Sequence, residues 1–167
     1  MSMKIIAPIA AGVLLALAGA AQAATKSTTF QVSATVAKNC IINAAPLSFV
    51  GFDGSVDVTS SSTITVRCTN GTAYDVNLST GSSNDFQTRR MTNGTAYLEY
   101  NLYVNGTNTI WGDTTNGTGR PATGTGAGLG LAQAQTLTVD GRLPVTANNA
   151  AADALTFTDT ITATIIY

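Results

Sequence analysis

The sequence predicts an all-β protein, an antiparallel sandwich or barrel, from three observations. After residue 23, several segments alternate apolar and polar residues with a period of two, the pattern of half-buried strands. The 167 residues include 28 threonines, and β-branched residues favour the pleated surface of a sheet. Asn-Gly or Asp-Gly pairs occur between many of these segments, as tight turns between antiparallel strands require.

Six segments carry the alternation, and each keeps its apolar side chains on one face. The first has the clearest pattern, with Phe30, Val32, Ala34 and Val36 on one side and threonine, serine and glutamine on the other. In the segment 96–104 the outward side chains are expected to include Tyr97, Glu99, Asn101 and Tyr103. The last segment alternates Phe157, Ile161, Ala163, Ile165 and Tyr167 against threonines. The expected strands are residues 28–36, 63–68, 73–79, 96–104, 136–145 and 157–167.

Turns are expected at Asp53-Gly54, Asn70-Gly71, Asn93-Gly94, Asn105-Gly106 and Asp140-Gly141. Residues 116–130 contain six glycines and are expected to form a surface loop. No P-loop lysine follows these glycines, which argues against a phosphate site.

The first 23 residues have the pattern of a cleaved export signal. Lys4 precedes an apolar run over residues 5–20, and Ala21-Gln22-Ala23 provides small residues before a cut. The run is shorter than the roughly 20 residues that span a bilayer. Export to an oxidising compartment predicts that the two cysteines, Cys40 and Cys68, form a disulfide rather than a metal or redox site.

Composition excludes several functional classes. The chain has no histidine, which removes Ser-His-Asp and Cys-His catalysis and the commonest metal ligand. The net charge of −1 gives no basic field for a nucleic acid. The acidic residues are scattered, and no pair has a spacing that forces two carboxylates together. We therefore expect no enzyme, no cofactor, no metal and no nucleic-acid partner.

Two groups of surface residues are open to a functional interpretation. Arg89-Arg90 is expected to form a solvated strand edge or a contact between subunits. Trp111, Tyr97 and Tyr103 offer aromatic rings for stacking on a sugar, although such rings also pack cores and interfaces. The alternative function is thus a secreted carbohydrate-binding sandwich that folds alone.

The segment 28–36 itself allows two interpretations. It is either the ordinary first strand of the sandwich or a strand that leaves its own subunit and completes the sheet of another, which is β-strand addition. Its nine residues reach about 30 Å when extended, enough to run along a sandwich.

The chain after residue 23 resembles the spore coat protein U-like domain family, which includes the pilins of archaic, Csu-type chaperone-usher pili. The likeness is greatest to the major pilins of that type, and it depends on the order and spacing of many short pieces. The pieces are VAKNC at 36–40, LSF at 47–49, STITVRCTNG at 62–71, YDVNL at 74–78, RM at 90–91, LEYNLY at 98–103, WGD at 111–113, VDGRL at 139–143 and FTDTI at 157–161.

The resemblance implies an immunoglobulin-like antiparallel sandwich that lacks its final strand. A donor strand from a periplasmic chaperone, and later from the next subunit at an outer-membrane usher, completes such folds. It places the donor on Phe30, Val32, Ala34 and Val36. It places the acceptor groove along the last strand, with Phe157, Ile161, Ala163, Ile165 and Tyr167.

The implied domains are a signal peptide over 1–23, a donor-strand arm over 24–37 and a pilin sandwich over 38–167. The implied function is an adhesive, biofilm-promoting surface fibre, with copies of the chain as a homopolymeric shaft. One departure separates the chain from conventional pilins, which have a penultimate tyrosine and a glycine about fourteen residues from the end. Here Tyr167 is last, and Asp153 and Ala154 occupy that region. The C-terminal sequence therefore fits the archaic branch of these pilins and not the conventional branch.

Overall fold

The computed structural model describes residues 23–113 and 119–167. The expected export signal, up to residue 22, and the start of the expected glycine-rich loop, residues 116–118, lie outside the described residues. The chain divides into two units, Met1–Thr35 and Val36–Tyr167. The described part of the first unit, residues 23–35, contains no helix or strand.

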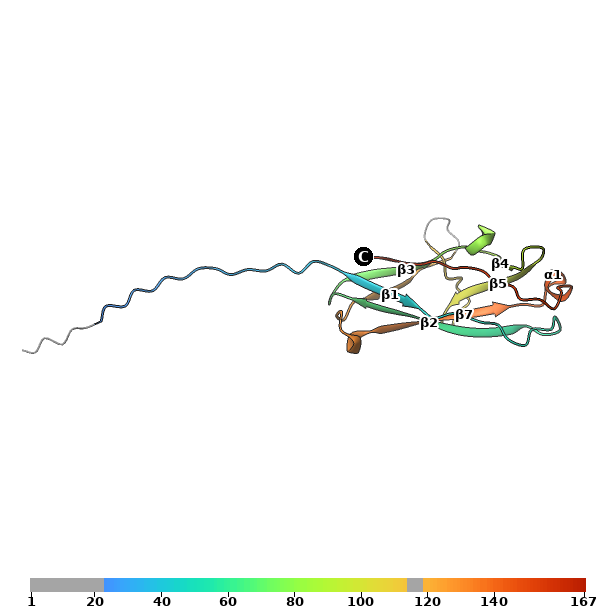
Figure 1. The fold of residues 1–167 in the computed structure, drawn as a ribbon, viewed down its shortest axis with the longest axis horizontal. Helices are drawn as coiled ribbons and strands as arrows, with labels where there is room; N and C mark the ends of the chain where they lie inside the picture. Colours follow the sequence, from blue (N-terminus) through green and yellow to red (C-terminus); the bar gives the residue numbers. More distant parts are fainter. Residues whose placement is uncertain (1–22, 114–118) are drawn as a thin grey trace, which may run out of the picture. The chain divides into compact units, whose positions relative to one another are not determined.

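The unit Val36–Tyr167 contains two antiparallel sheets, which confirms the predicted all-β class (Figure 1). The larger sheet has the strand order β1-β2-β7-β5-β4, and the smaller has the order β6-β3-β8. The strands are β1 (Cys40–Ala44), β2 (Val58–Cys68), β3 (Ala73–Leu78), β4 (Arg89–Thr92), β5 (Tyr97–Val104), β6 (Ala122–Thr125), β7 (Gln135–Leu143) and β8 (Ala163–Ile166). Three short helical turns connect them: η1 (Gly81–Ser83), η2 (Leu131–Gln133) and α1 (Ala147–Ala150).

A single apolar core lies between the inner faces of the two sheets. Alternate residues of β2, β5 and β7 meet alternate residues of β3, as the period of two predicts. The buried apolar members are Ile64, Val66, Cys68, Tyr74, Val76, Leu78, Leu98, Tyr100, Leu102, Trp111, Ala122, Val139 and Leu143.

The predicted strand 28–36 is absent from both sheets, and 157–167 is a strand only over Ala163–Ile166. Three strands were not predicted: β1, β4 and β6. β1 is five residues long and carries two adjacent isoleucines instead of an alternation. β6 lies inside the expected glycine-rich loop, where Gly124 leaves space for the ring of Tyr74, because a Cβ there would overlap that ring.

The prediction of a turn at Asp140-Gly141 is wrong, because both residues lie inside β7 and pair with β2 and β5. Gly141 has a packing role instead. A Cβ on it would come within 2.8 Å of the ring of Phe49 and 3.0 Å of the Leu47 side chain. The glycine therefore lets the segment that follows β1 pack against the larger sheet.

Candidate functional site: an open groove between the sheets

A groove of about 960 Å³ lies within the unit Val36–Tyr167. One side, which we call the β1-side wall, is formed by residues 44–54, that is, by the last residue of β1 and the segment that follows it. The other, the β8-side wall, is formed by residues 152–163, which lead into β8. The groove thus runs between an edge of the larger sheet and an edge of the smaller one.

Core residues of β2, β3, β5 and β7 form the floor of the groove. Each is less than a tenth exposed, so the groove opens directly onto the hydrophobic core rather than onto a polar surface. A sandwich that had its full set of strands would cover these side chains. The floor residues are Ile64, Leu78, Leu98, Tyr100, Leu102, Val139 and Leu143.

The backbone along both walls has free hydrogen-bonding groups. Among the described residues, β1 pairs only with β2 and β8 pairs only with β3. The Ser79 N–H donates to the Thr162 carbonyl, so by the alternation of an antiparallel ladder the backbone groups of Ile161, Ala163 and Ile165 point away from β3. In the β1-side wall, no backbone N–H of residues 47–52 donates a hydrogen bond within the described part of the chain. The groove is therefore bordered by two stretches of backbone, one following β1 and one leading into β8, whose free groups can bond to an added strand.

Tyr100 connects the two walls across the floor. Its ring meets the ring of Phe49, in the β1-side wall, edge to face at 6.1 Å between centroids. Its hydroxyl donates to Asp159 Oδ2, in the β8-side wall, at 2.6 Å. Burial, together with this bond to the carboxylate, raises the pKa of Tyr100 well above the usual value near 10, so the hydroxyl stays protonated as a donor.

Asp159 is held in place from the other side. Its Oδ1 accepts hydrogen bonds from the backbone N–H groups of Ser82, at 3.0 Å, and Thr160, at 2.9 Å. Gly81 leaves room for the carboxylate, because a Cβ at that glycine would overlap it. These contacts fix the β8-side wall at the level of Tyr100.

Arg89 contradicts the expectation of a solvated pair with Arg90, because it is completely buried at 0% exposure. Its guanidinium donates to the carbonyls of Ser79 and Trp111 and, at 2.6 Å, to Asn101 Oδ1. Asn101 was expected on the outward face but is also buried, because its side chain is a partner of Arg89. Its amide nitrogen donates to the carbonyls of Phe86 and Gln87. Burial lowers the pKa of Arg89, while Tyr100 and Asp159 act in the opposite direction.

The aromatic platform of the alternative function is not present. Trp111 is completely buried, and its indole N–H donates to the Val76 carbonyl. Tyr97 and Tyr103 instead lie under arginine side chains, Arg90 at 4.5 Å and Arg142 at 4.2 Å from the ring centroids. These three rings therefore do not form one exposed stacking surface.

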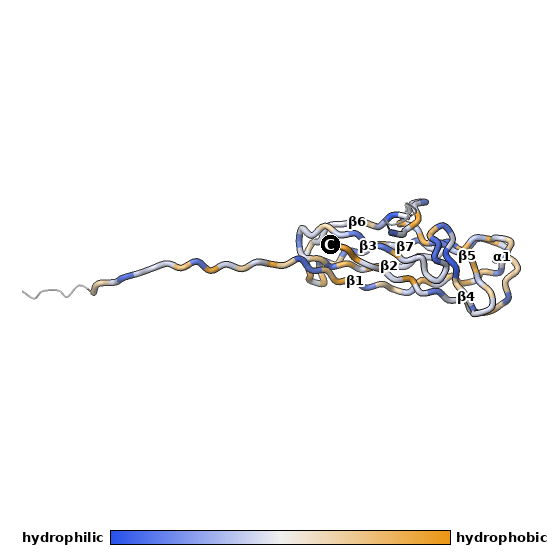
Figure 2. The backbone as a smooth tube through the Cα atoms, turned by 90° about the horizontal axis from the view of Figure 1, so that it is seen from above, coloured by the Kyte–Doolittle hydropathy of each residue, from blue (hydrophilic) through white to orange (hydrophobic). Residues whose placement is uncertain are grey.

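Three of the five residues expected in an acceptor groove line the observed groove: Phe157, Ile161 and Ala163. Ile165 packs against the core beyond the groove, and Tyr167, outside the groove lining, is 52% exposed. On residues 28–36, Phe30 is 85% exposed, Val32 81% and Val36 80%, and Ala34 is exposed as well. Figure 2 shows hydrophobic and hydrophilic residues following one another along the N-terminal segment that precedes β1. The β1-side wall was not predicted, and its signal in the sequence is the apolar spacing of Leu47, Phe49 and Phe52.

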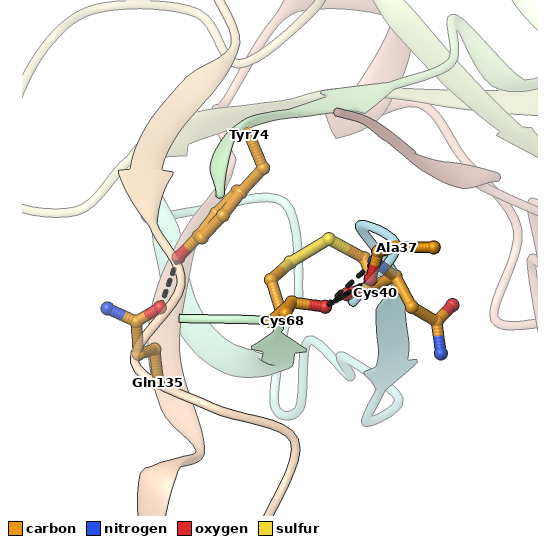
Figure 3. Close-up of a disulfide and its surroundings, with 7 residues drawn as sticks. Ala37, Cys40, Cys68, Tyr74 and Gln135 are labelled. Atoms are coloured by element: carbon orange, nitrogen blue, oxygen red, sulfur yellow. Dashed lines mark hydrogen bonds between the residues drawn. A yellow bond between two sulfur atoms is a disulfide. The ribbon is translucent and has the colours of Figure 1, made fainter. Parts of the chain in front are cut away.

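The predicted disulfide between Cys40 and Cys68 is present (Figure 3). It joins the first residue of β1 to the last residue of β2, which are paired in the sheet. Beside it, the Asn39 N–H donates to Thr69 Oγ1 and the Thr69 N–H donates to the Asn39 carbonyl. The start of the β1 edge is therefore fixed covalently and by hydrogen bonds.

The described residues offer two further observations. No group of three or more His, Cys, Asp or Glu side chains among them is placed to hold a metal ion. Across residues 23–113 and 119–167, no helix is long and apolar enough to cross a membrane.

Comparison with known proteins gives a family and a structural neighbour. The model of the Spore Coat Protein U domain matches residues 26–164. No curated protein matches. Among solved structures, the crystal structure of the CsuC-CsuE chaperone-tip adhesion subunit pre-assembly complex from archaic chaperone-usher Csu pili of Acinetobacter baumannii matches with a TM-score of 0.56 and 24% identity. The match covers 80% of this chain and 40% of that chain, so the likeness concerns the fold of one part of the neighbour.

Proposed function

The chain belongs to the Spore Coat Protein U domain family, and from that premise we propose that it is a subunit of an archaic chaperone-usher pilus. Each copy polymerises by inserting its own residues 28–36 into the groove of another copy. The observation that carries this proposal is the groove itself, an opening onto the core between the β1-side wall and the β8-side wall, both with free backbone groups. The neighbour's description, a chaperone with a pilus subunit, agrees with it.

The segment 28–36 has the chemistry that the groove requires. An inserted strand must present apolar side chains to the floor at every second position and bond to both walls through its backbone. Phe30, Val32 and Val36 are exposed large apolar residues at that spacing, and burying each contributes about 1.5–3 kcal/mol. Nine extended residues reach about 30 Å, and the β8-side wall is of similar length in residues.

The direction of the strands favours a fibre. β1 begins, and β8 ends, at the same end of the sandwich (Figure 1). A strand from a neighbour that runs antiparallel to β8 has its C-terminal end at the opposite end of the sandwich, so the neighbour's own sandwich follows there. This contact is head-to-tail, and head-to-tail contacts that do not close propagate as filaments.

The proposal assigns residues 1–23 to a signal peptide, 24–37 to a donor-strand arm and 38–167 to the pilin sandwich. Before assembly the open edges of the groove need protection, because such edges template aggregation. A periplasmic chaperone that inserts its own strand supplies it, and an outer-membrane usher exchanges that strand for the arm. The product is a fibre outside the cell, which serves attachment and biofilm formation, and none of these steps requires catalysis or a cofactor.

Substitution on the two faces of the arm tests the proposal. Phe30→Asp or Val32→Asp places a carboxylate where the arm meets the apolar floor, so we expect export to continue and fibres to be lost. Gln31→Asp adds the same charge on the alternate face, and fibres should persist. Fibres are counted by electron microscopy, and the exported chain is quantified by immunoblot. Normal fibres from Phe30→Asp and Val32→Asp would contradict the proposal.

A further inference from the structure

We infer that Tyr100 sets the register of the inserted arm by admitting only the small side chain of Ala34 at its level in the groove. This inference rests on the proposed function, because it specifies how the arm of one copy lies in another. In this register each apolar arm residue lies opposite one residue of the β8-side wall. The pairs are Phe30 with Ala163, Val32 with Ile161, Ala34 with Asp159, and Val36 with Phe157.

The hydrogen-bonding pattern of β8 limits the possible registers. Ile161 and Ala163 turn their backbone groups toward the groove and their side chains toward the core. In an antiparallel pair, directly opposite residues have side chains on the same face. Even-numbered arm residues must therefore lie opposite odd-numbered wall residues, because a slip by one would turn the apolar face outward. The remaining registers differ by two residues.

The shape of the groove selects among these registers. Tyr100 fills the floor at the level of Asp159, and the contacts to Phe49 and Asp159 prevent its ring from moving aside. A small side chain suits the position above this ring, and Ala34 is the small member of the apolar set. Ala44 and Ala163 also line the groove, and the inferred register places the phenyl ring of Phe30 opposite the small side chain of Ala163.

Each neighbouring register is worse by the same criterion. A shift of two residues in one direction places Val32 at Asp159, so that the larger valine side chain lies over the Tyr100 ring. The small Ala34 then lies opposite Phe157, away from that ring. The opposite shift places Phe30 at Ile165, which does not line the groove. Overpacking a large side chain such as Val32 against the Tyr100 ring typically costs about 1–3 kcal/mol of stability.

Engineered disulfides in assembled fibres measure the register directly. Thr162 bonds to β3 through its backbone, so a residue opposite it in the arm forms a non-hydrogen-bonded pair, with Cα atoms about 4.5 Å apart and within disulfide range. The inferred register places Gln31 opposite Thr162. Fibres of the full chain carrying Gln31→Cys with Thr162→Cys should form a covalent ladder on a non-reducing denaturing gel.

Two matched pairs report the alternatives, Thr29→Cys with Thr162→Cys and Ser33→Cys with Thr162→Cys. A stronger ladder from either pair, or fibres without a ladder from any pair, overturns the register and leaves the proposed function standing. A cross-link within a single chain, or a parent chain that forms no fibres, overturns the proposed function itself. Mixing chains that carry only Gln31→Cys with chains that carry only Thr162→Cys separates links between chains from links within one.

A size substitution tests the role of Tyr100 independently. Ala34→Leu adds bulk toward the Tyr100 ring and should abolish fibres. Ser33→Leu adds bulk on the opposite face of the arm and should leave fibres unchanged. Fibres from Ala34→Leu at the parent level would overturn the inference.

Discussion

Arg89 shows at the scale of single residues how the interior of this sandwich accommodates a charge. No carboxylate of the described residues pairs with this arginine, and instead its donors reach two carbonyls and the Asn101 side chain. It also lies against the Phe86 ring, with its guanidinium carbon 5.3 Å from the centroid. Arg90, the next residue of β4, faces outward and pairs with Glu99 at 3.7 Å. Two adjacent arginines therefore have opposite environments.

Substituting each arginine in turn should lower the free energy of unfolding by different amounts. Arg89→Met leaves several buried acceptors without a donor, at about 1–3 kcal/mol each, so we expect the free energy of unfolding to fall by about 3 kcal/mol or more. Arg90→Met removes an exposed ion pair and should cost less than about 1 kcal/mol. Chemical denaturation of both variants measures the difference, and equal losses would contradict the described network.

The sequence could not predict which arginine is buried. Both residues are charged, and their orientation depends on the register of β4 against β5, which pairs Arg89 with Tyr100 and Arg90 with Glu99. The hydrogen bond from Arg89 to the Asn101 side chain also explains why Asn101 is buried, although the alternation of its strand predicts an exposed position. In contrast, the disulfide between Cys40 and Cys68 was predictable, because the sequence has two cysteines and therefore one possible pairing within the chain.

At the scale of elements, three strands with a regular alternation, β3, β5 and β7, were predicted to within a few residues, whereas residues 28–36 alternate most clearly and pair in neither sheet. β3, β5 and β7 each bury alternate side chains against the opposite sheet, so the period of two is visible in the sequence. β1, β4 and β6 are edge strands of four or five residues, too short for a period to be recognised. The β8-side wall alternates along its length although much of it is not paired as a strand, which is why residues 157–167 were overestimated.

The disulfide stabilises the element that begins the β1-side wall. It closes a loop with a sequence separation of 28 residues. Replacing both cysteines by alanine should lower the free energy of unfolding by about 3.5 kcal/mol, the chain-entropy value for a loop of this length. Urea denaturation measures the change, with the chemically reduced parent chain as a control. A loss below about 1 kcal/mol would mean that this constraint contributes little.

At the scale of the whole molecule, the groove and the segment 28–36 have complementary properties. The groove lacks a strand over its apolar floor, and the segment is an apolar strand pattern with no partner in either sheet. The sequence supplied the alternation of the segment and of the β8-side wall. The β1-side wall and the contacts from Phe49 through Tyr100 to Asp159 could not be predicted from the sequence, because they depend on how distant segments pack around the floor.

A cryo-electron microscopy structure of the assembled fibre would show directly whether the arm of one copy occupies the groove of the next. We expect residues 28–36 of one copy to lie as a strand between the β1-side wall and the β8-side wall of the next copy, with Phe30, Val32 and Val36 facing the floor. A fibre in which the groove is empty, or is filled by the copy's own residues 28–36, would contradict polymerisation by strand exchange.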